Sequence, residues 1–382
     1  MKIMQICFTP IVGTAGGVEK VFCNMANHFC TEHKIVNVCN DSKKGLPYYS
    51  LDKRVDFRNI NKGMKIPFTI RIKSEIVRLL RKTGVKLEHP KEVWQRSIVF
   101  EALMKTIEKT EPEIVLCYDL NSLMAISQTG FSLDKCILMI HTNGELALES
   151  MNEKQIEVTK KIKYVQVLTE KYKDAFQKVG YKNVVCIGNI VPQFDDINFE
   201  NKENTIVHVG RLDKKIKRQH LLIEAFAEIA DMFPDWNLKL IGGDSNPENY
   251  EEELKGLIKS RDLENRVFML GKCNNVHEEL KHARIFAFPS KNEGFPLSLT
   301  EAFSCGLPAV GFEEAHGVNI FIRNGENGYL AKETMDFAEK LKVLMENKEI
   351  TSMYGMRAMK EMKQYTSENV YKQWDILINS MI

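Results

Sequence analysis

Two glutamates in the stretch KNEGFPLSLTEAFSCGLPAV (291–310) have the spacing and surroundings of ligand-binding carboxylates. Glu293 and Glu301 flank a Gly294-Phe295-Pro296 turn, and seven residues separate them. The preceding FAFPS is typical of a strand that ends at Ser290, which places the turn where open α/β sheets bind ligands. Proline suits the first turn of a helix, because its missing N–H would be unpaired there. The stretch therefore predicts a helix that begins at the ligand-binding edge of a sheet.

The amino end of that helix is predicted to bind an anion. The backbone N–H groups of Leu297 and Ser298, together with the helix dipole, favour a diphosphate. Glu301 lies one turn inside the helix, so its carboxylate can accept hydrogen bonds from the two hydroxyls of an attached ribose. Glu293, in the loop, faces the other side of the phosphates, where a sugar would lie. A capped helix with one structural and one exposed acid is the plainer alternative.

A basic stretch, VGRLDKKIKRQHLLIEAF (209–226), supports the same chemistry. It places Gly210-Arg211 at the end of a predicted strand, with Lys217 and Arg218 before the next helix. Arginine offers a bidentate fork to phosphate and lysine a point charge. Such a pair would neutralise a departing nucleoside diphosphate. Taken alone, the pattern also fits a solvated basic turn.

Short apolar runs alternate with amphipathic helical patterns along most of the chain, which predicts an α/β fold with parallel sheets. The predicted strands form two series, one before and one after the polar linker GNIVPQFDDINFENKEN (188–204). We therefore predict two doubly wound domains, residues 1–190 and 191–364, and a C-terminal helix over 365–382 that packs back on the first. The expected strands are 2–8, 34–40, 113–119, 136–142, 163–169, 183–189, 205–210, 236–242, 266–271, 284–289 and 307–312.

The segment 62–91 differs from the rest in charge. It contains nine Lys or Arg residues against two acids, a local net charge of +7, and Ile72, Ile76, Leu79 and Leu80 share one helical face. A basic amphipathic helix can lie on an anionic membrane. An ordinary solvated helix with a core-facing stripe fits the pattern equally well. The whole chain has 53 basic and 51 acidic residues, a net charge of +2, which gives no reason to expect nucleic-acid binding.

In order along the chain, GGVEK, an apolar strand leading into a histidine, VGRL with a following lysine, EGFPLSLTEA and NGENGYL resemble glycosyltransferase family four. The resemblance covers nearly the whole chain and is densest between Thr205 and Leu330. It implies the GT-B fold, in which two Rossmann-like domains with parallel sheets face each other across a cleft. It also implies a retaining enzyme that uses a nucleotide-sugar donor.

The resemblance gives roles to residues at matching positions. It implies catalytic roles for His141, facing the reacting centre, and for Glu293, at the donor sugar. It also implies catalytic roles for Arg211 and Lys217, at the diphosphate. The expected donor-binding residues are Gly16, Gly17, Gly210, Arg211, Lys217, Leu270, Gly271, Glu293, Gly294, Phe295, Leu297, Ser298 and Glu301.

Two features depart from the family pattern. One extra residue separates Gly210-Arg211 from Lys217, which makes Lys215 an alternative phosphate contact. Asn319 stands where many relatives carry an acid, which puts the fine handling of the donor in question.

The expected reaction transfers a sugar from a nucleoside diphosphate, most often UDP in this family, to a hydroxyl of a glycan or lipid-linked acceptor, with retention. Surface polysaccharide, lipopolysaccharide or capsule synthesis is the expected setting, in the cytoplasm or at the inner face of the membrane. We expect no metal and no cofactor, since the basic pair and the helix end carry the leaving-group charge. Three alternatives stay open: a sugar-nucleotide epimerase of the same fold, a nicotinamide-dependent oxidoreductase and a non-catalytic binding protein. The glycine loop VGTAGGVE does not fit the G-x-G-x-x-G pattern that the oxidoreductase needs.

Overall fold

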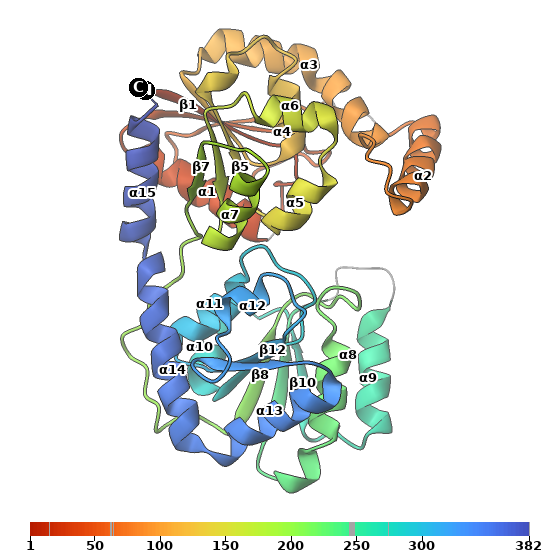
Figure 1. The fold of residues 1–382 in the computed structure, drawn as a ribbon, viewed down its shortest axis with the longest axis vertical. Coiled ribbons are helices and arrows are strands. Elements are labelled where there is room, and N and C mark those ends of the chain that lie inside the picture. The colour runs from red at the N-terminus through yellow and green to blue at the C-terminus, as the bar shows by residue number, and fades with distance from the viewer. Residues whose placement is uncertain (15, 62, 64, 244–248, 274, 382) are drawn as a thin grey trace. The chain divides into compact units, whose positions relative to one another are not determined.

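The computed structural model describes residues 1–14, 16–61, 63, 65–243, 249–273 and 275–381 (Figure 1). The chain divides into two compact units: unit 1 is Met1–Gly188 with Tyr371–Ile382, and unit 2 is Asn189–Val370. The sequence analysis placed the domain boundary at 190/191 and the start of the returning segment at 365. Within the described residues, no helix has the length and apolar character needed to cross a membrane.

Unit 1 is built on a seven-stranded sheet in the order β3-β2-β1-β4-β5-β6-β7, in which every neighbouring pair runs parallel. Its central strands are buried along most of their length, as expected for a sheet covered on both faces. The strands are β1 Lys2–Cys7, β2 Lys34–Cys39, β3 Asp56–Asn59, β4 Ile114–Cys117, β5 Cys136–Met139, β6 Tyr164–Val167 and β7 Val184–Cys186.

The helices of unit 1 follow the strands in alternation. Helix α1 buries Phe22, Met25 and Phe29 on one face, which is the 3.6-residue spacing of its sequence. Asp119 begins α4, because its side chain accepts a hydrogen bond from the Ser122 N–H at 2.8 Å. The helices are α1 Gly17–Phe29, α2 Phe68–Lys82, α3 Pro90–Thr110, α4 Leu120–Ile126, α5 Gly144–Ser150, α6 Glu153–Thr159, α7 Glu170–Lys178 and α15 Ser367–Asn379.

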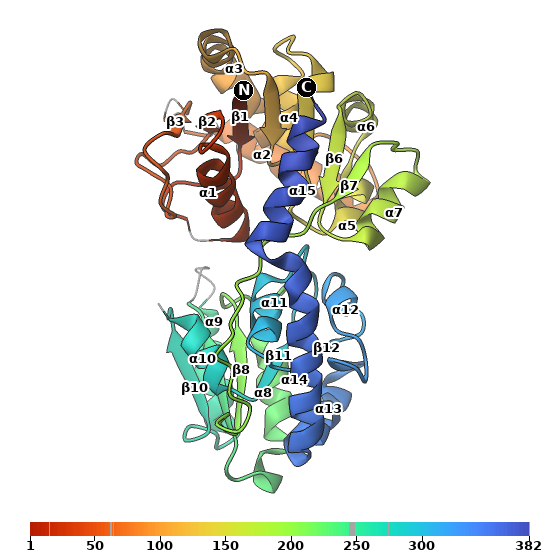
Figure 2. The ribbon, with the colours of Figure 1, turned by 90° about the vertical axis from the view of Figure 1, so that its left-hand side faces the viewer.

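Helix α15 ends the chain against unit 1 (Figure 2). The ring of Tyr371 stacks on that of His28 with centroids 3.8 Å apart, and Asp375 Oδ1 lies 2.9 Å from His28 Nε2. These contacts join α15 to α1.

Unit 2 contains a six-stranded sheet in the order β10-β9-β8-β11-β12-β13, again with parallel neighbours. Its strands are β8 Thr205–Val209, β9 Asn237–Ile241, β10 Val267–Gly271, β11 Ile285–Phe288, β12 Ala309–Phe312 and β13 Gly328–Ala331. Its helices are α8 Gln219–Ala227, α9 Tyr250–Ser260, α10 Val276–His282, α11 Leu297–Ser304, α12 Val318–Phe321, α13 Thr334–Glu346 and α14 Lys348–Met362.

Two strands were missed in the sequence. Both β3 and β13 are edge strands of four residues, and β3 has no buried residue. The sequence of β3, DFRN, lacks the apolar run that marked the other strands, and β13, GYLA, is too short to be recognised as a strand by its pattern. Helix α8 ends at Ala227, and a separate 3₁₀ turn covers Ala230–Met232.

The basic segment 62–91 forms one exposed helix and the start of another. Helix α2 has no buried residue, and Figure 1 shows it apart from the sheet of unit 1, beside the beginning of α3. Phe68 is 75% exposed and Leu79 is 58% exposed. The stripe therefore does not face the core. Lys62, where the segment begins, lies outside the described residues.

Gly355 sets how closely α14 approaches the end of α11. A Cβ at this position would overlap the backbone carbonyl oxygen of Gly306. We expect Gly355→Ala to lower the free energy of unfolding by about 1–3 kcal/mol, the usual cost of overpacking. Urea unfolding of the variant measures this.

Gly256→Ala is the matched control, because Gly256 is exposed on α9 with open space around its Cα. Alanine there is expected to stabilise by roughly 0.5–1 kcal/mol. Equal effects of the two changes would contradict the packing argument.

Candidate active site

The amino end of α11 meets the carboxyl end of β11, as the sequence predicts. Pro296 directly precedes the helix, and no side chain caps the helix amino end. The first backbone N–H groups, including those of Leu297 and Ser298, are thereby oriented to bind an anion. Both residues are half-buried, whereas Leu299 and Thr300 behind them are fully buried. The core thus fixes the helix while its end stays accessible.

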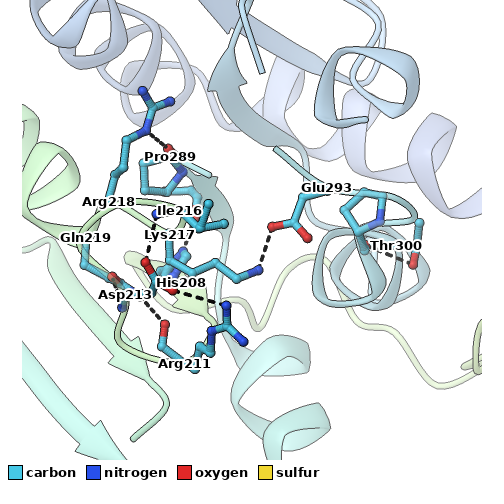
Figure 3. Close-up of polar contacts among 12 residues, drawn as sticks. His208, Arg211, Asp213, Ile216, Lys217, Arg218, Gln219, Pro289, Glu293 and Thr300 are labelled. Atoms are coloured by element: carbon cyan, nitrogen blue, oxygen red, sulfur yellow. Dashed lines mark hydrogen bonds and ion pairs between the residues drawn. The ribbon is translucent and has the colours of Figure 1, made fainter. Parts of the chain in front are cut away.

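Asp213 shapes the loop that follows β8. Its carboxylate accepts hydrogen bonds from the N–H groups of Lys215 at 3.0 Å and Ile216 at 2.9 Å. Its carbonyl accepts those of Lys217 and Arg218, each at 2.9 Å. This turn directs Lys217 toward α11 and turns Arg218 the other way, where it donates to the Pro289 carbonyl (Figure 3).

Lys217 and Glu293 form the central contact of unit 2. Lys217 Nζ lies 2.6 Å from Glu293 Oε1, and the two side chains are 15% and 16% exposed. The stem of Lys217 passes over Gly210, where an added Cβ would lie 3.5 Å from it, and its ammonium sits 5.1 Å from the Phe288 ring centroid. A glutamate from the α11 loop and a lysine from the β8 loop thus meet, although they lie 76 positions apart in the sequence.

His208, on β8, supports the loop that follows this strand through its hydrogen bonds. It is fully buried, which lowers its pKa to about 4, so the ring is neutral at pH 7. Nδ1 faces the Ala287 carbonyl at 2.9 Å and therefore carries the proton, and Nε2 faces the Gln219 amide at 3.2 Å. Gln219 also donates to the Arg211 carbonyl at 2.9 Å. The Arg211 side chain, 59% exposed, reaches Asp213 at 3.1 Å.

Glycines let the loops after β8, β9 and β10 approach one another. The N–H of Gly242 donates to the Gly271 carbonyl at 2.8 Å, and the N–H of Gly210 donates to the Ile241 carbonyl at 2.9 Å. Gly242 has φ +144°, and a Cβ there would overlap the Gly210 carbonyl. Only glycine meets both conditions. The backbone of these loops therefore comes close together beside Lys217.

His141 lies in unit 1, after β5, and lines a pocket of about 370 Å³. Its ring stacks on Tyr118, with centroids 5.2 Å apart. Burial lowers the pKa of His141 to about 4, so the ring is neutral. In the described part of the chain, neither ring nitrogen has a hydrogen-bond partner, although both are buried. Buried polar atoms are normally paired, which points to a ligand in this pocket.

Gly16 and Gly17 begin α1, where the sequence analysis placed backbone contacts to a diphosphate. The Glu19 side chain lies against Gly16, so that a Cβ there would meet its carboxylate. Burial raises the pKa of Glu19. A carboxylate therefore already occupies the space beside this helix end.

The remaining expected residues are distributed as follows. Glu301 is half-buried on the second turn of α11. Leu270, 41% exposed, and Gly271, with φ +63°, end the edge strand β10. Of the two candidate lysines, Lys217 pairs with Glu293, whereas Lys215 is exposed in the turn.

Asn319 has a structural reason to be an amide. Its Nδ2 donates to the Glu313 carbonyl at 2.9 Å, which an ionised acid could not do.

Sequence reasoning missed Asp213, Gly242 and the His208–Gln219 support. Gly242-Gly243 after a predicted strand was a readable signal for a close backbone approach. His208 and Gln219 gave none, because a histidine in a strand and a glutamine in a helix are ordinary.

Gly242→Ala is expected to abolish ligand binding at this surface by displacing the β8 loop. The positive φ costs about 1–3 kcal/mol for a non-glycine residue, in addition to the overlap. Binding of nucleoside diphosphates by calorimetry and unfolding in urea measure the two effects. Gly256→Ala, with the same added methyl group, is expected to bind as the wild type does; a Gly242→Ala protein that also binds normally would refute the role of this loop.

Comparison with known proteins gives a consistent result. Residues 191–368 match the family "Glycosyl transferases group 1". An uncharacterized glycosyltransferase from Haemophilus influenzae is 27% identical over 96% of this chain and 97% of its own length. The amylovoran biosynthesis glycosyltransferase AmsD from Erwinia amylovora is 22% identical over 96% and 97%. The crystal structure of Anabaena HepE in complex with UDP-glucose has a TM-score of 0.72 over 100% of both chains, at 18% identity.

Proposed function

Because this chain has the GT-B fold and its residues 191–368 match the group 1 family of glycosyl transferases, we propose that it transfers a sugar from a UDP-sugar to a glycan hydroxyl with retention of configuration. Unit 2 is the proposed donor site and the pocket of unit 1 the proposed acceptor site. Surface polysaccharide synthesis is the proposed setting, in line with the role that the name of the Erwinia relative gives to that protein.

The observation that carries the proposal is the Lys217–Glu293 pair at the uncapped end of α11. Backbone N–H groups at the amino end of α11 would bind the diphosphate beside this pair. A leaving UDP gathers negative charge, which Lys217, Arg211 and the α11 amino end would stabilise. In the ligand-free protein, Glu293 holds the lysine in place and would then accept hydrogen bonds from sugar hydroxyls. Such donors and acceptors are fixed before the reaction, so little reorganisation is needed.

In the proposed step, the acceptor oxygen attacks the anomeric carbon on the face that the diphosphate leaves. The bond from that carbon to the diphosphate oxygen breaks, and the same phosphate oxygen takes the acceptor proton. Lys217 and Arg211 balance the charge throughout. His141, being neutral, would act as a hydrogen-bond partner of the sugar and not as an acid.

The roles of the Lys217 and Glu293 charges can be measured separately. Glu293→Gln keeps the shape but removes the charge that holds Lys217, so UDP is expected to bind at least as tightly as to the wild type. Transfer is expected to fall about 100-fold, the usual loss for a polar group that stabilises a transition state. Lys217→Met is expected to weaken UDP binding itself. It removes a positive charge from the diphosphate site and leaves the Glu293 carboxylate there without its charge partner. Calorimetry with UDP and a transfer assay measure the two quantities.

Glu253→Gln is the matched control, since Glu253 pairs with Lys214 on the exposed surface of the same unit, where both side chains are about half exposed. Tighter binding of GDP or ADP than of UDP would refute the assignment of uracil as the base of the donor nucleotide. Conversion of a UDP-sugar without any acceptor would favour the epimerase.

We also propose that α2 contacts an anionic membrane. Its apolar face is exposed, and Arg71, Arg78 and Lys82 lie along the same helix. Each basic residue near an anionic surface contributes about 1 kcal/mol. An amphipathic helix with such a polar face lies in the interface plane.

Vesicles of equal phosphatidylglycerol and phosphatidylcholine are expected to co-sediment with the protein, and Ile76→Glu on α2 is expected to prevent this. Ile376→Glu is the control, because Ile376 is an exposed isoleucine on α15 of the same unit. Equal sedimentation of all three proteins, or none by the wild type, would contradict membrane contact.

A further inference from the structure

Arg218 occupies an unusual position directly before α8. Its backbone is left-handed, with φ +53° and ψ +40°, a conformation that is unfavourable for most residues other than glycine. Its guanidinium Nη2 is buried and, among the residues that the structure describes, has no hydrogen-bond partner. Both features cost free energy, and backbone strain of this kind is concentrated at functional sites. The stability of the fold therefore does not by itself explain this arginine.

The Arg218 side chain joins the β8 loop to the ends of two other strands. Its Nε donates a hydrogen bond to the Pro289 carbonyl at 2.9 Å, directly after β11 (Figure 3). Its Nη1 lies 2.8 Å from Glu314 Oε1, in the loop that follows β12. The guanidinium also lies 4.7 Å from the ring centroid of Phe312, the last residue of β12. Because the side chain is only 14% exposed, water competes little for these contacts.

One end of this connection fixes the backbone at Lys217. Lys217 and Arg218 are neighbours, and each donates its backbone N–H to the Asp213 carbonyl at 2.9 Å. The Lys291 N–H donates to the Ile216 carbonyl at 2.8 Å, so the β8 loop is joined to the β11 loop on both sides of Lys217. The backbone from which the Lys217 side chain leaves is thereby held against the end of β11.

The other end fixes the backbone at Glu293. Pro289, which accepts the hydrogen bond from Arg218, lies four positions before Glu293. The Glu293 N–H donates to the His316 carbonyl at 2.9 Å, and His316 lies two positions after Glu314. Arg218 is thus connected to the Glu293 backbone by two routes, one through the end of each strand.

We propose that Arg218 is a positioning residue that sets the separation of Lys217 and Glu293 during the reaction. This deepens the proposed function and rests on it. In the ligand-free protein the two side chains hold each other at 2.6 Å. Once a diphosphate binds Lys217 and sugar hydroxyls bind Glu293, that contact is lost, and the joined loops have to keep the two side chains in place. A displacement of about 1 Å can lower a rate about 100-fold.

Arg218→Gly removes the connection and suits the left-handed backbone. We expect kcat for sugar transfer to fall about tenfold, because the two side chains are less well placed in the transition state. The Kd for UDP, measured by calorimetry, should stay close to that of the wild type, since Lys217 remains. Arg218→Lys keeps the charge but not the planar fork, so its kcat should lie between those of the other two proteins. Arg261→Gly is the matched control, because Arg261 pairs with Glu228 on the exposed surface of the same unit, and its kcat should not change.

A merely structural role is tested by repeating the change in a Lys217→Met protein. Without Lys217 there is no pair to position, so Arg218→Gly should then leave kcat nearly unchanged. A structural defect would instead lower kcat by the same factor in both backgrounds, which would overturn the proposal. So would a wild-type kcat in Arg218→Gly. If the glycine variant does not fold, Glu314→Gln breaks the ion pair to Arg218 without changing the backbone and takes its place in both comparisons.

The positioning role and the donor site can fail separately. Acetylation of Lys217 by acetic anhydride, measured by mass spectrometry, needs neither substrate nor activity. It should be several times faster in Arg218→Gly than in the wild type, because the loop is held less firmly, whereas acetylation of Lys255, exposed on α9, should not change. Faster acetylation of Lys217 in the variant, with no UDP binding by the wild type, would refute the donor site alone. UDP binding with unchanged acetylation and kcat in the variant would refute only the positioning role.

Discussion

Parallel strand pairing is the constraint on which both candidate sites depend. Every neighbouring strand pair in the two sheets runs parallel, so the carboxyl ends of all strands in a sheet meet at one edge. In unit 2 this edge gathers the loops after β8, β9, β10 and β11, from distant parts of the sequence. Each loop then needs a way to approach its neighbours without steric conflict. Gly242 provides it for β8 and β9, and the Asp213 turn fixes how Lys217 leaves the β8 loop.

The electrostatics of unit 2 follow from that crowding. A lysine and a glutamate that are each about five-sixths buried are stable there because they face each other at 2.6 Å. In the proposed reaction, a diphosphate would replace Glu293 as the partner of the lysine, and sugar hydroxyls would replace Lys217 as the partners of the glutamate. Next to this pair, the Gln219 amide donates hydrogen bonds to the neutral His208 ring and to the Arg211 carbonyl. Neither side chain adds a charge. Charge is thereby confined to the surface that would touch the donor.

Adjacent helices of unit 1 differ in which residues they expose. Helix α3 begins at Pro90 and carries Glu92 and Gln95 to the pocket, while α2 buries no residue of its own. An exposed apolar stripe costs free energy in water, so its retention beside basic residues agrees with a function at a surface. The unpaired nitrogens of His141 carry a comparable cost inside the pocket. Both features are more readily explained by ligands than by stability of the isolated chain.

The sequence by itself determined the fold class, nearly all strands, and the residues at the α11 end, because apolar periodicity and the Gly-Phe-Pro turn are local signals. It also identified Lys217, Glu293 and His141 as candidates. Only the tertiary structure decided that Lys217 and not Lys215 meets Glu293, since one residue of loop length turns a side chain toward or away from a site. It also decided that the α2 stripe faces outward and that Glu92 and Arg81 share a pocket. Periodicity defines a helical face, but the contacts that cover it or leave it exposed come from segments distant in the chain.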